Sequence, residues 1–311
     1  MNDMRVTGIR CGWTKHEGGP VMGGQYGTCF DLAVLQDDGM LKMFFSWRPK
    51  KSIAYAESTD GIHWSEPVIC LEPRETKEGW EDEVNRPCVV KKDGVYHMWY
   101  TGQFKAGMPD GTSHIFYATS KDGINFERAS DIPVMTPSAS WEKSAIMNPD
   151  VLWDDTEQIF KMWYSAGEQY EPNAIGYAES ADGVHWSKNG NNPILQKNPD
   201  NTWEQHKVAG CHVVKADWYY MFYIGYFNED YAQIGIARSK DGMHDWERHP
   251  MNPMIAPEPE SWDGEACYKP YPVFDGEKWM LWYNGRVGTY EQIGLALHKG
   301  YDLGFDSSEE K

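Results

Sequence analysis

The sequence lacks a long apolar run, a surplus of basic residues and any closely spaced pair of cysteines. No segment approaches the length of apolar sequence that crosses a bilayer, and residues 1–12 contain no apolar core of the kind found in signal peptides. The sequence therefore predicts no membrane-spanning helix, and we expect a cytoplasmic protein.

The charge balance is strongly acidic, with 47 Asp and Glu residues against 29 Lys and Arg residues in a chain of 311 residues. Nucleic acids and anionic membranes are bound by basic protein surfaces, so the formal net charge of −18 argues against both as partners. The six cysteines contain no Cys-x-x-Cys pair, which argues against a zinc site or a disulfide framework. We expect them to be buried free thiols.

Aromatic residues are abundant, with 15 Trp and 18 Tyr, and many lie in a motif that recurs along the chain. The clearest copy is Met-Trp-Tyr-Ser at residues 162–165, followed by Ile-Gly-Tyr-Ala-Glu-Ser-Ala-Asp-Gly at residues 175–183. Its aromatic half recurs at residues 43–45, 98–100, 221–223 and 281–283, and its closing Ser-x-Asp-Gly box recurs at residues 58–61, 120–123 and 239–242. A period of about 60 residues indicates a repeat architecture.

Each repeat divides into four short segments bounded by turn signals such as Lys-Asp-Gly at residues 92–94, which is typical of antiparallel strands. The sequence therefore predicts an all-β fold, a five-bladed β-propeller of four-stranded antiparallel blades that occupies residues 1–311 as a single domain. The fifth repeat ends after its third strand. We expect an N-terminal strand at residues 5–10 to complete this last blade and close the ring.

Residues that recur unchanged serve the shared fold, so the aspartates of the Ser-x-Asp-Gly boxes are expected to form turns. Functional residues are expected where the repeats differ. Strand direction places the starts of the innermost strands on the same face as the loops between second and third strands, so these side chains should meet in one axial funnel. The predicted catalytic residues are Asp31, Glu83, Asp150 and Glu265. The predicted substrate-binding residues are Arg48, Arg86, Gln103, Glu168, His212, Lys269 and Arg286.

The recurring strand and hairpin motifs cover nearly the whole chain and resemble those of the five-bladed propeller glycosidases of families 43, 32, 68 and 130. The resemblance implies a base or nucleophile at Asp31 and a second, acid-tuning aspartate. The nearest match to that aspartate is Asp150, two residues past the position that Asn148 occupies. The resemblance also implies a glutamic acid as general acid, but its position holds Ala209. His212 is similar to a residue that helps to hold a central ion in some relatives.

We interpret the chain as a glycoside hydrolase that acts on a neutral oligosaccharide or polysaccharide. Paired carboxyl groups among aromatic residues suit acid/base cleavage of a sugar linkage. Asp31 is the expected ionised partner, with Glu83 or Glu265 as the acid, and Arg86 and Lys269 would hold substrate hydroxyls. No cofactor is expected; the resemblance leaves a central ion near His212 as an alternative.

Two other functions remain open. A non-catalytic carbohydrate-binding propeller would account for the alanine at position 209. A mannoside phosphorylase of the family 130 type would need a phosphate pocket made from Arg86, Lys269, Arg286 or Arg48. A sialidase is disfavoured, because the spacing of its Asp boxes differs and no arginine trio can be placed from the sequence.

Overall fold

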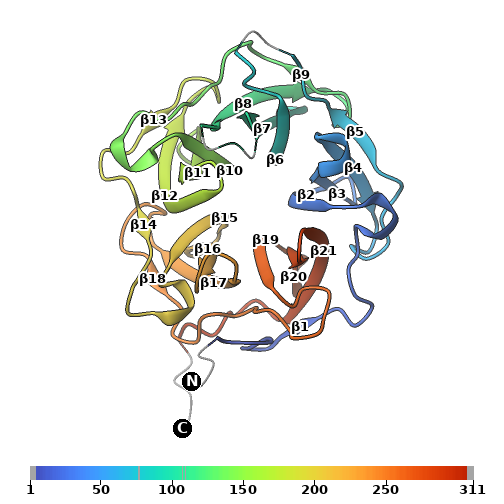
Figure 1. Cartoon of the computed structure of the whole chain (residues 1–311), viewed down its shortest axis with the longest axis vertical. Helices are drawn as coiled ribbons and strands as arrows, with labels where there is room; N and C mark the ends of the chain where they lie inside the picture. Colours follow the sequence, from blue (N-terminus) through green and yellow to red (C-terminus); the bar gives the residue numbers. More distant parts are fainter. Residues whose placement is uncertain (1–4, 76–77, 107, 109, 307–311) are drawn as a thin grey trace.

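The computed structural model describes residues 5–75, 78–106, 108 and 110–306. Within these ranges the chain forms β-strands and short 3-10 turns and contains no α-helix. The strands stand around a central axis in antiparallel groups, with β2, β6, β10, β15 and β19 innermost (Figure 1). The predicted all-β propeller is confirmed. None of the described helical segments could serve as a membrane span.

In the described residues the strands form five antiparallel units, here called blades 1 to 5 in chain order. Blade 1 contains β2 (Cys29–Asp37), β3 (Met40–Trp47), β4 (Ser52–Ser58) and β5 (Val68–Leu71). Blade 2 contains β6 (Glu83–Lys92), β7 (Val95–Phe104), β8 (Thr112–Ser120) and β9 (Glu127–Arg128). Blade 3 contains β10 (Ala145–Asp154), β11 (Ile159–Glu168), β12 (Glu171–Ser180), β13 (Ser187–Lys188) and β14 (Leu195–Gln196).

Blade 4 contains β15 (Lys207–Lys215), β16 (Tyr219–Tyr226), β17 (Ala232–Ser239) and β18 (Glu247–Arg248). Blade 5 contains β19 (Ala266–Phe274), β20 (Lys278–Val287), β21 (Tyr290–Lys299) and β1 (Trp13–Lys15). The 3-10 turns are η1 (Gly24–Tyr26), η2 (Arg48–Lys50), η3 (Ser140–Glu142) and η4 (Thr202–Glu204). Blades 2 and 3, and blades 4 and 5, are also joined by single parallel bridges between strands.

An N-terminal strand completes the last blade, as the sequence predicted, but it is not the segment that the sequence indicated. β1 pairs antiparallel with β21, with Trp13 opposite His298. The predicted residues 5–10 instead run past blade 4, where Ile9 forms a bridge with Ile255. Trp13 is almost fully buried and its ring meets Phe222 edge to face at 6.2 Å, so burial of this indole selects the later segment.

The two halves of the repeated motif are partners across blade boundaries. The indole of Trp99 in blade 2 donates a hydrogen bond to the carbonyl of Gly183 in blade 3 at 2.8 Å. The same bond joins Trp163 to Gly242 at 2.8 Å and Trp282 to Gly61 at 2.9 Å. The tryptophan of each Met-Trp-Tyr strand thus needs the glycine of the next blade's Ser-x-Asp-Gly box, which explains why both recur together.

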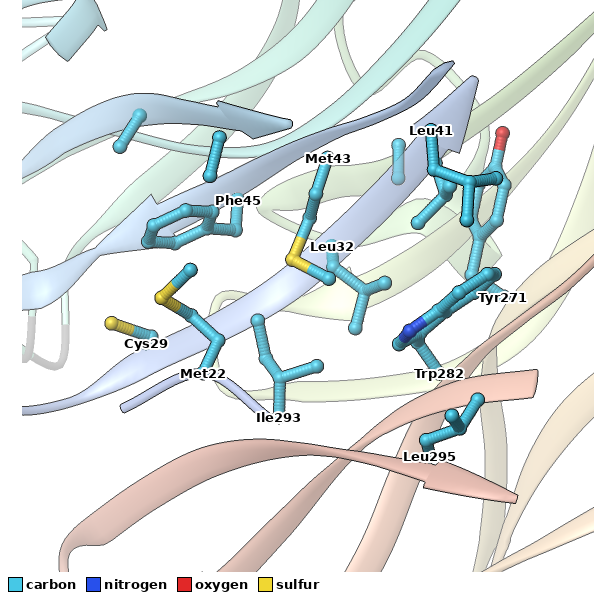
Figure 2. Close-up of a cluster of buried hydrophobic side chains, with 14 of the residues drawn as sticks. Met22, Cys29, Leu32, Leu41, Met43, Phe45, Tyr271, Trp282, Ile293 and Leu295 are labelled. Atoms are coloured by element: carbon cyan, nitrogen blue, oxygen red, sulfur yellow. The ribbon is translucent and has the colours of Figure 1, made fainter. Parts of the chain in front are cut away.

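The hydrophobic core is divided among these blade boundaries. Figure 2 shows the boundary where the ring closes, with side chains of β2 and β3 packed against side chains of β20 and β21. The labelled residues are Met22, Cys29, Leu32, Leu41, Met43, Phe45, Tyr271, Trp282, Ile293 and Leu295. The six cysteines are free, and all but Cys11 are buried, as predicted. Burial raises the pKa of the Cys29 thiol to about 12, so it stays protonated at neutral pH.

The Ser-x-Asp-Gly boxes form tight turns, as the sequence predicted. In the first box, Oδ1 of Asp60 accepts the amides of Ile62 and His63, each at 2.8 Å, and Oγ of Ser58 accepts the amide of Gly61 at 2.9 Å. Hydrogen bonds from the side chain and amide of His63 hold the pKa of Asp60 well below its usual range. The boxes therefore terminate hairpins and shape the face opposite the innermost strand starts.

A second repeated feature is a fully buried acid that precedes the innermost strand of four blades. Glu142 is the clearest example: Tyr164 donates its hydroxyl to this carboxylate at 2.8 Å, and Lys188 pairs with it at 2.7 Å. Glu81, Glu204 and Asp263 repeat the arrangement with Tyr100, Tyr223 and Tyr283. In blade 1, phenylalanine replaces this tyrosine at position 45, and residues 18–28 contain no acid. The acid and the tyrosine are therefore present or absent together.

The contact between box glycine and tryptophan gives a test of the blade boundary. A Cβ atom at Gly183, where φ is +77°, would lie 2.8 Å from Cζ2 of Trp99. Gly183→Ala should lower the free energy of unfolding by about 1–2 kcal/mol for the left-handed conformation and by a further ~1–3 kcal/mol for overpacking. Urea unfolding followed by tryptophan fluorescence measures the loss.

Two glycines serve as matched controls. Gly94 has a φ of +76° but no atom within 4 Å of the added Cβ, so Gly94→Ala should show the conformational part of the loss alone. Gly190 has neither constraint, and Gly190→Ala should change stability by less than about 1 kcal/mol. A Gly183→Ala variant no less stable than Gly94→Ala would contradict the importance of the packing contact.

Candidate functional site

The innermost strand of every blade carries one residue in the left-handed region near its start. These residues are Asp31 (φ 47°), Arg86 (φ 54°), Asn148 (φ 52°), Gly210 (φ 36°) and Lys269 (φ 49°). At each position the pairing with the second strand shifts register, which marks a β-bulge. Side chains other than glycine adopt this conformation at a cost, and such strain persists where the surrounding structure fixes it. The bulges break the alternation of the strands at the central axis.

The bulges are held from the preceding blade. In four of the five described cases, the backbone amide of the left-handed residue donates to a polar side chain on the second strand of the blade before it. The pairs are Asp31 with Asn284 at 3.0 Å, Arg86 with Ser46 at 2.9 Å, Asn148 with Thr101 at 3.3 Å and Gly210 with Ser165 at 2.7 Å. The corresponding residue for Lys269 is Ile224, which offers no acceptor on its side chain. Four of the five bulges are thus held by a side chain of the preceding blade.

A cavity of about 260 Å³ lies over these bulges. Asp31, Arg86, Asn148 and Ala209 line it from the innermost strands. Loops between second and third strands contribute Arg48, Tyr170, Glu229 and Asp230, and strand ends contribute Tyr226, Arg286 and Glu291. Strand starts and loops of different blades therefore meet at one site, with charges of both signs.

Asp31 is a carboxylate of the cavity that is held through both oxygens. Its side chain is nearly buried, Oδ1 accepts the side-chain amide of Asn284 at 3.0 Å, and Oδ2 lies 3.1 Å from Nε of Arg86. Nη1 of Arg86 donates in turn to Oδ1 of Asn85 at 2.8 Å. These contacts fix the position of the Asp31 side chain at the axis.

A second ionic pair stands at the wall of the cavity. Arg48 lies 2.6 Å from Glu291, and the hydroxyl of Tyr268 donates to the same carboxylate. Burial raises the pKa of Tyr268 well above its ordinary value, and the charge of Glu291 adds to this effect. The pKa of Tyr226 is also raised, mainly by burial and then by the charge of Asp31. Both phenols therefore remain hydrogen-bond donors over the ordinary pH range.

Asn148 lines the cavity, and its side-chain carbonyl oxygen has no hydrogen-bond partner among the described residues. Its side chain is 6% exposed, and Nδ2 lies 3.4 Å from Oγ of Ser165. Oδ1 is buried and accepts no hydrogen bond from any residue that the structure describes. A buried carbonyl oxygen left unpaired is costly, so this position fits a hydroxyl donor supplied by a bound molecule.

Two predicted residues, Asp150 and His212, lie in the middle of innermost strands, two positions past the bulges at Asn148 and Gly210. Nδ1 of His212 is 2.7 Å from Oδ1 of Asp150, and the second oxygen of Asp150 accepts the amide of Val213 at 2.8 Å. The ring of His212 stacks on Tyr271 with centroids 3.8 Å apart. His212 borders a separate cavity of about 590 Å³ that also includes Lys215. No group of three or more potential metal ligands occurs within the described part of the chain.

The remaining predicted residues are not among those that line the axial cavity with Asp31. Glu83 borders a neighbouring cavity of about 480 Å³. Glu265 is exposed and accepts the amide of Gly288 at 2.7 Å. Lys269 is 2% exposed.

Two predicted substrate-binding residues are engaged elsewhere. Gln103 is buried and accepts a hydrogen bond from Asn85 at 2.6 Å. Glu168 is exposed and lies 3.2 Å from Lys143. Of the eleven residues predicted for the site, the structure thus brings Asp31, Arg48, Arg86 and Arg286 together.

Several cavity residues were not predicted, among them Tyr170, Lys207, Glu229 and Glu291. One signal for Glu291 existed in the sequence, because the start of the third strand varies between repeats as strongly as that of the first. The five residues two positions before the third-strand motif are Lys51, Ser113, Asn173, Ala232 and Glu291. For Glu229 the loops differ too much in length for the repeats to be aligned.

Comparison with known proteins relates the chain to carbohydrate-active enzymes. Residues 33–204, more than half of the chain, match the family described as the glycosyl hydrolases family 32 N-terminal domain. The chain is 30% identical over 219 residues to the uncharacterized protein Rv1502 of Mycobacterium tuberculosis, an alignment that covers 67% of this chain and 69% of that protein.

Two further similarities concern enzymes of stated activity. The chain is 32% identical over 139 residues to a 1,2-beta-oligomannan phosphorylase of Thermoanaerobacter, which covers 40% of this chain and 44% of that protein. The crystal structure of a thermostable family-43 glycoside hydrolase aligns with a TM-score of 0.70 over 89% of this chain and 91% of that chain. At 18% sequence identity this second match shows a shared fold.

The pairing of Asp31 and Arg86 gives a test of the axial geometry. Arg86→Gln should lower the free energy of unfolding at neutral pH by about 3 kcal/mol, because it leaves a buried carboxylate without its cation. The double variant Asp31→Asn/Arg86→Gln should recover part of this loss, which urea unfolding of the four proteins would measure. Strictly additive losses would mean that the two side chains do not stabilise each other.

Proposed function

Because this chain belongs to the family of glycosyl hydrolase family 32 N-terminal domains, we propose that it cleaves glycosidic bonds in the axial cavity. The observation that carries the proposal is the setting of Asp31. It is the one acidic residue among the five left-handed residues at the axis, and it is fixed by Arg86 and Asn284 while facing the cavity. A pre-positioned, ionised carboxylate is what attack at an anomeric carbon requires.

Asp31 serves as general base or nucleophile in this proposal. As a base it takes a proton from the water that attacks the sugar, and as a nucleophile it attacks the anomeric carbon itself. Arg86 keeps the carboxylate charged and oriented through the 3.1 Å contact. Asn148, with its unpaired carbonyl oxygen, receives a hydroxyl of the bound sugar.

Tyr170 supplies an apolar surface at the edge of the cavity. It lines the cavity, yet 47% of its surface is exposed, which is unusual for a large aromatic side chain. An exposed ring can stack on the apolar face of a sugar without first losing other contacts. The substrate in this proposal is therefore an oligosaccharide whose ring rests against Tyr170.

Phosphorolysis is a second candidate, favoured by the cations of the cavity. Arg48, Arg86, Lys207 and Arg286 all line it, although the whole chain is acidic. Nη2 of Arg286 binds the main-chain oxygen of Asp230 at 2.7 Å, and the carboxylate of Asp230 is 3.9 Å away. The positive charge of Arg286 is thus only weakly compensated by a carboxylate, which suits binding of inorganic phosphate. The similarity to a phosphorylase points the same way.

Removal of the axial carboxylate tests the first proposal. Asp31→Asn should lower turnover by at least ~10³-fold, since a catalytic carboxylate is lost. The amide keeps a hydrogen-bonding group next to Asn284. Suitable substrates are β-1,2-mannobiose, β-1,4-xylobiose and sucrose, with products followed by chromatography. Asp200→Asn, an exposed carboxylate outside the cavity lining, should leave turnover unchanged. Full activity of Asp31→Asn would remove this residue from the mechanism.

The same assay with and without inorganic phosphate separates the two reactions. Hydrolysis proceeds without phosphate and releases free sugars. Phosphorolysis needs phosphate and yields a sugar 1-phosphate, and Arg286→Gln should then raise the KM for phosphate severalfold. Products that are the same with and without phosphate would rule out the second candidate.

A further inference from the structure

Cleavage of a glycosidic bond needs a proton for the departing oxygen, so the cavity must contain a carboxyl group that is free to carry one. This inference rests on the proposed function. Four carboxyl groups line the cavity within the described part of the chain: Asp31, Glu229, Asp230 and Glu291. Their partners differ, and the differences identify the donor.

Two of the four are engaged by the protein through both oxygens. Oδ2 of Asp31 lies 3.1 Å from Arg86, and Oδ1 accepts a hydrogen bond from Asn284. Oε2 of Glu291 lies 2.6 Å from Arg48, and Oε1 accepts the hydroxyl of Tyr268. Neither group therefore has an oxygen free for the departing oxygen of a bound sugar.

The other two are neighbours on the loop between β16 and β17. Both are exposed, and Asp230 has Arg286 within 3.9 Å of its carboxylate. Glu229 lines the cavity and makes no ion pair or hydrogen bond with any residue that the structure describes. The loop itself is held by Asn228, whose side chain accepts the amides of Asp230 at 3.0 Å and Tyr231 at 2.8 Å.

We propose that Glu229 is the general acid of this protein. In blade 4 the innermost strand offers Ala209 and Lys207 to the cavity, neither of which is a carboxyl group, and Lys207 is paired with Glu171 at 2.7 Å. The acid from this blade comes instead from its loop between β16 and β17, which lines the same cavity as Asp31. Among the described residues, Glu229 is the cavity carboxyl group with neither a hydrogen bond nor an ion pair, so its oxygens are available to a bound sugar.

The step is a single proton transfer coupled to bond cleavage. As the bond between the anomeric carbon and the bridging oxygen breaks, its electron pair goes to the oxygen, which takes the proton of Glu229 and leaves as an alcohol. Glu229 becomes a carboxylate. Water or Asp31 attacks the anomeric carbon, and the leaving oxygen receives the same proton in either course.

Dependence on the leaving group distinguishes an acid from a residue that only shapes the cavity. Glu229→Gln should lower kcat/KM by about 10²–10⁴-fold for the disaccharide that the wild-type protein cleaves, because an alkoxide does not leave unprotonated. For the 4-nitrophenyl glycoside of the same sugar the loss should be less than about tenfold, since nitrophenolate leaves without a proton. The two rates are measured on the same preparations.

Asp110→Asn is the matched control, an exposed carboxylate on the corresponding loop of blade 2 that pairs with Lys105 and lies outside the cavity lining. It should behave as wild type with both substrates. Equal losses with both substrates in Glu229→Gln, or no loss, overturn the assignment of Glu229. If the wild-type protein cleaves none of the three disaccharides or their nitrophenyl counterparts, the proposed function fails first, and the inference fails with it.

Discussion

The hydrogen bond from a left-handed amide to the blade before it is the constraint on which the site depends. At four of the five described bulges it joins the second strand of one blade to the innermost strand of the next, so the axial residues Asp31, Arg86, Asn148 and Gly210 are not positioned by their own blades alone. Such a partner helps the strained conformation to persist. The ring therefore does more than bury hydrophobic surface, because it holds Asp31 and Arg86 where they can pair. The strained conformation of the axial residues therefore depends on contacts that exist only when neighbouring blades are assembled.

The blade boundaries also explain which residues recur. Trp99 is repeated because Gly183 of the next blade needs it, and Tyr164 is repeated because Glu142 is buried beneath it. Blade 1 has Phe45 in place of this tyrosine and also lacks the buried acid, so the tyrosine hydroxyl and the acid are absent together. Recurrence thus reports contacts between blades, whereas the axial positions are free of this requirement and vary. The proposed catalytic residue Asp31 lies at one of these variable axial positions.

The fold could be predicted from the sequence because its signals are local and repeated: strand patterns, box turns and period. The closing strand was placed wrongly at residues 5–10, because strand patterns do not show which indole will be buried against Phe222. For the site, the strand starts identified Asp31 and Arg86. Glu83 and Glu265 also lie near strand starts but outside the lining of the axial cavity, because both precede the bulges at which side chains reach the axis. The position of Glu229 depends on the path of the loop between β16 and β17, which the repeat pattern of the sequence does not predict.

The shared last blade has a consequence for biosynthesis. Trp13 pairs in the sheet with His298, so the ring has no closed form until 285 further residues have been translated after Trp13. At ordinary rates of elongation this interval lasts roughly 15–60 s. During that time the N-terminal segment has no strand to pair with, and the outer edge of the last blade does not yet exist. The axial amide of Asp31 has no acceptor until Asn284 has been translated, so the axial cavity is completed only with the final blade.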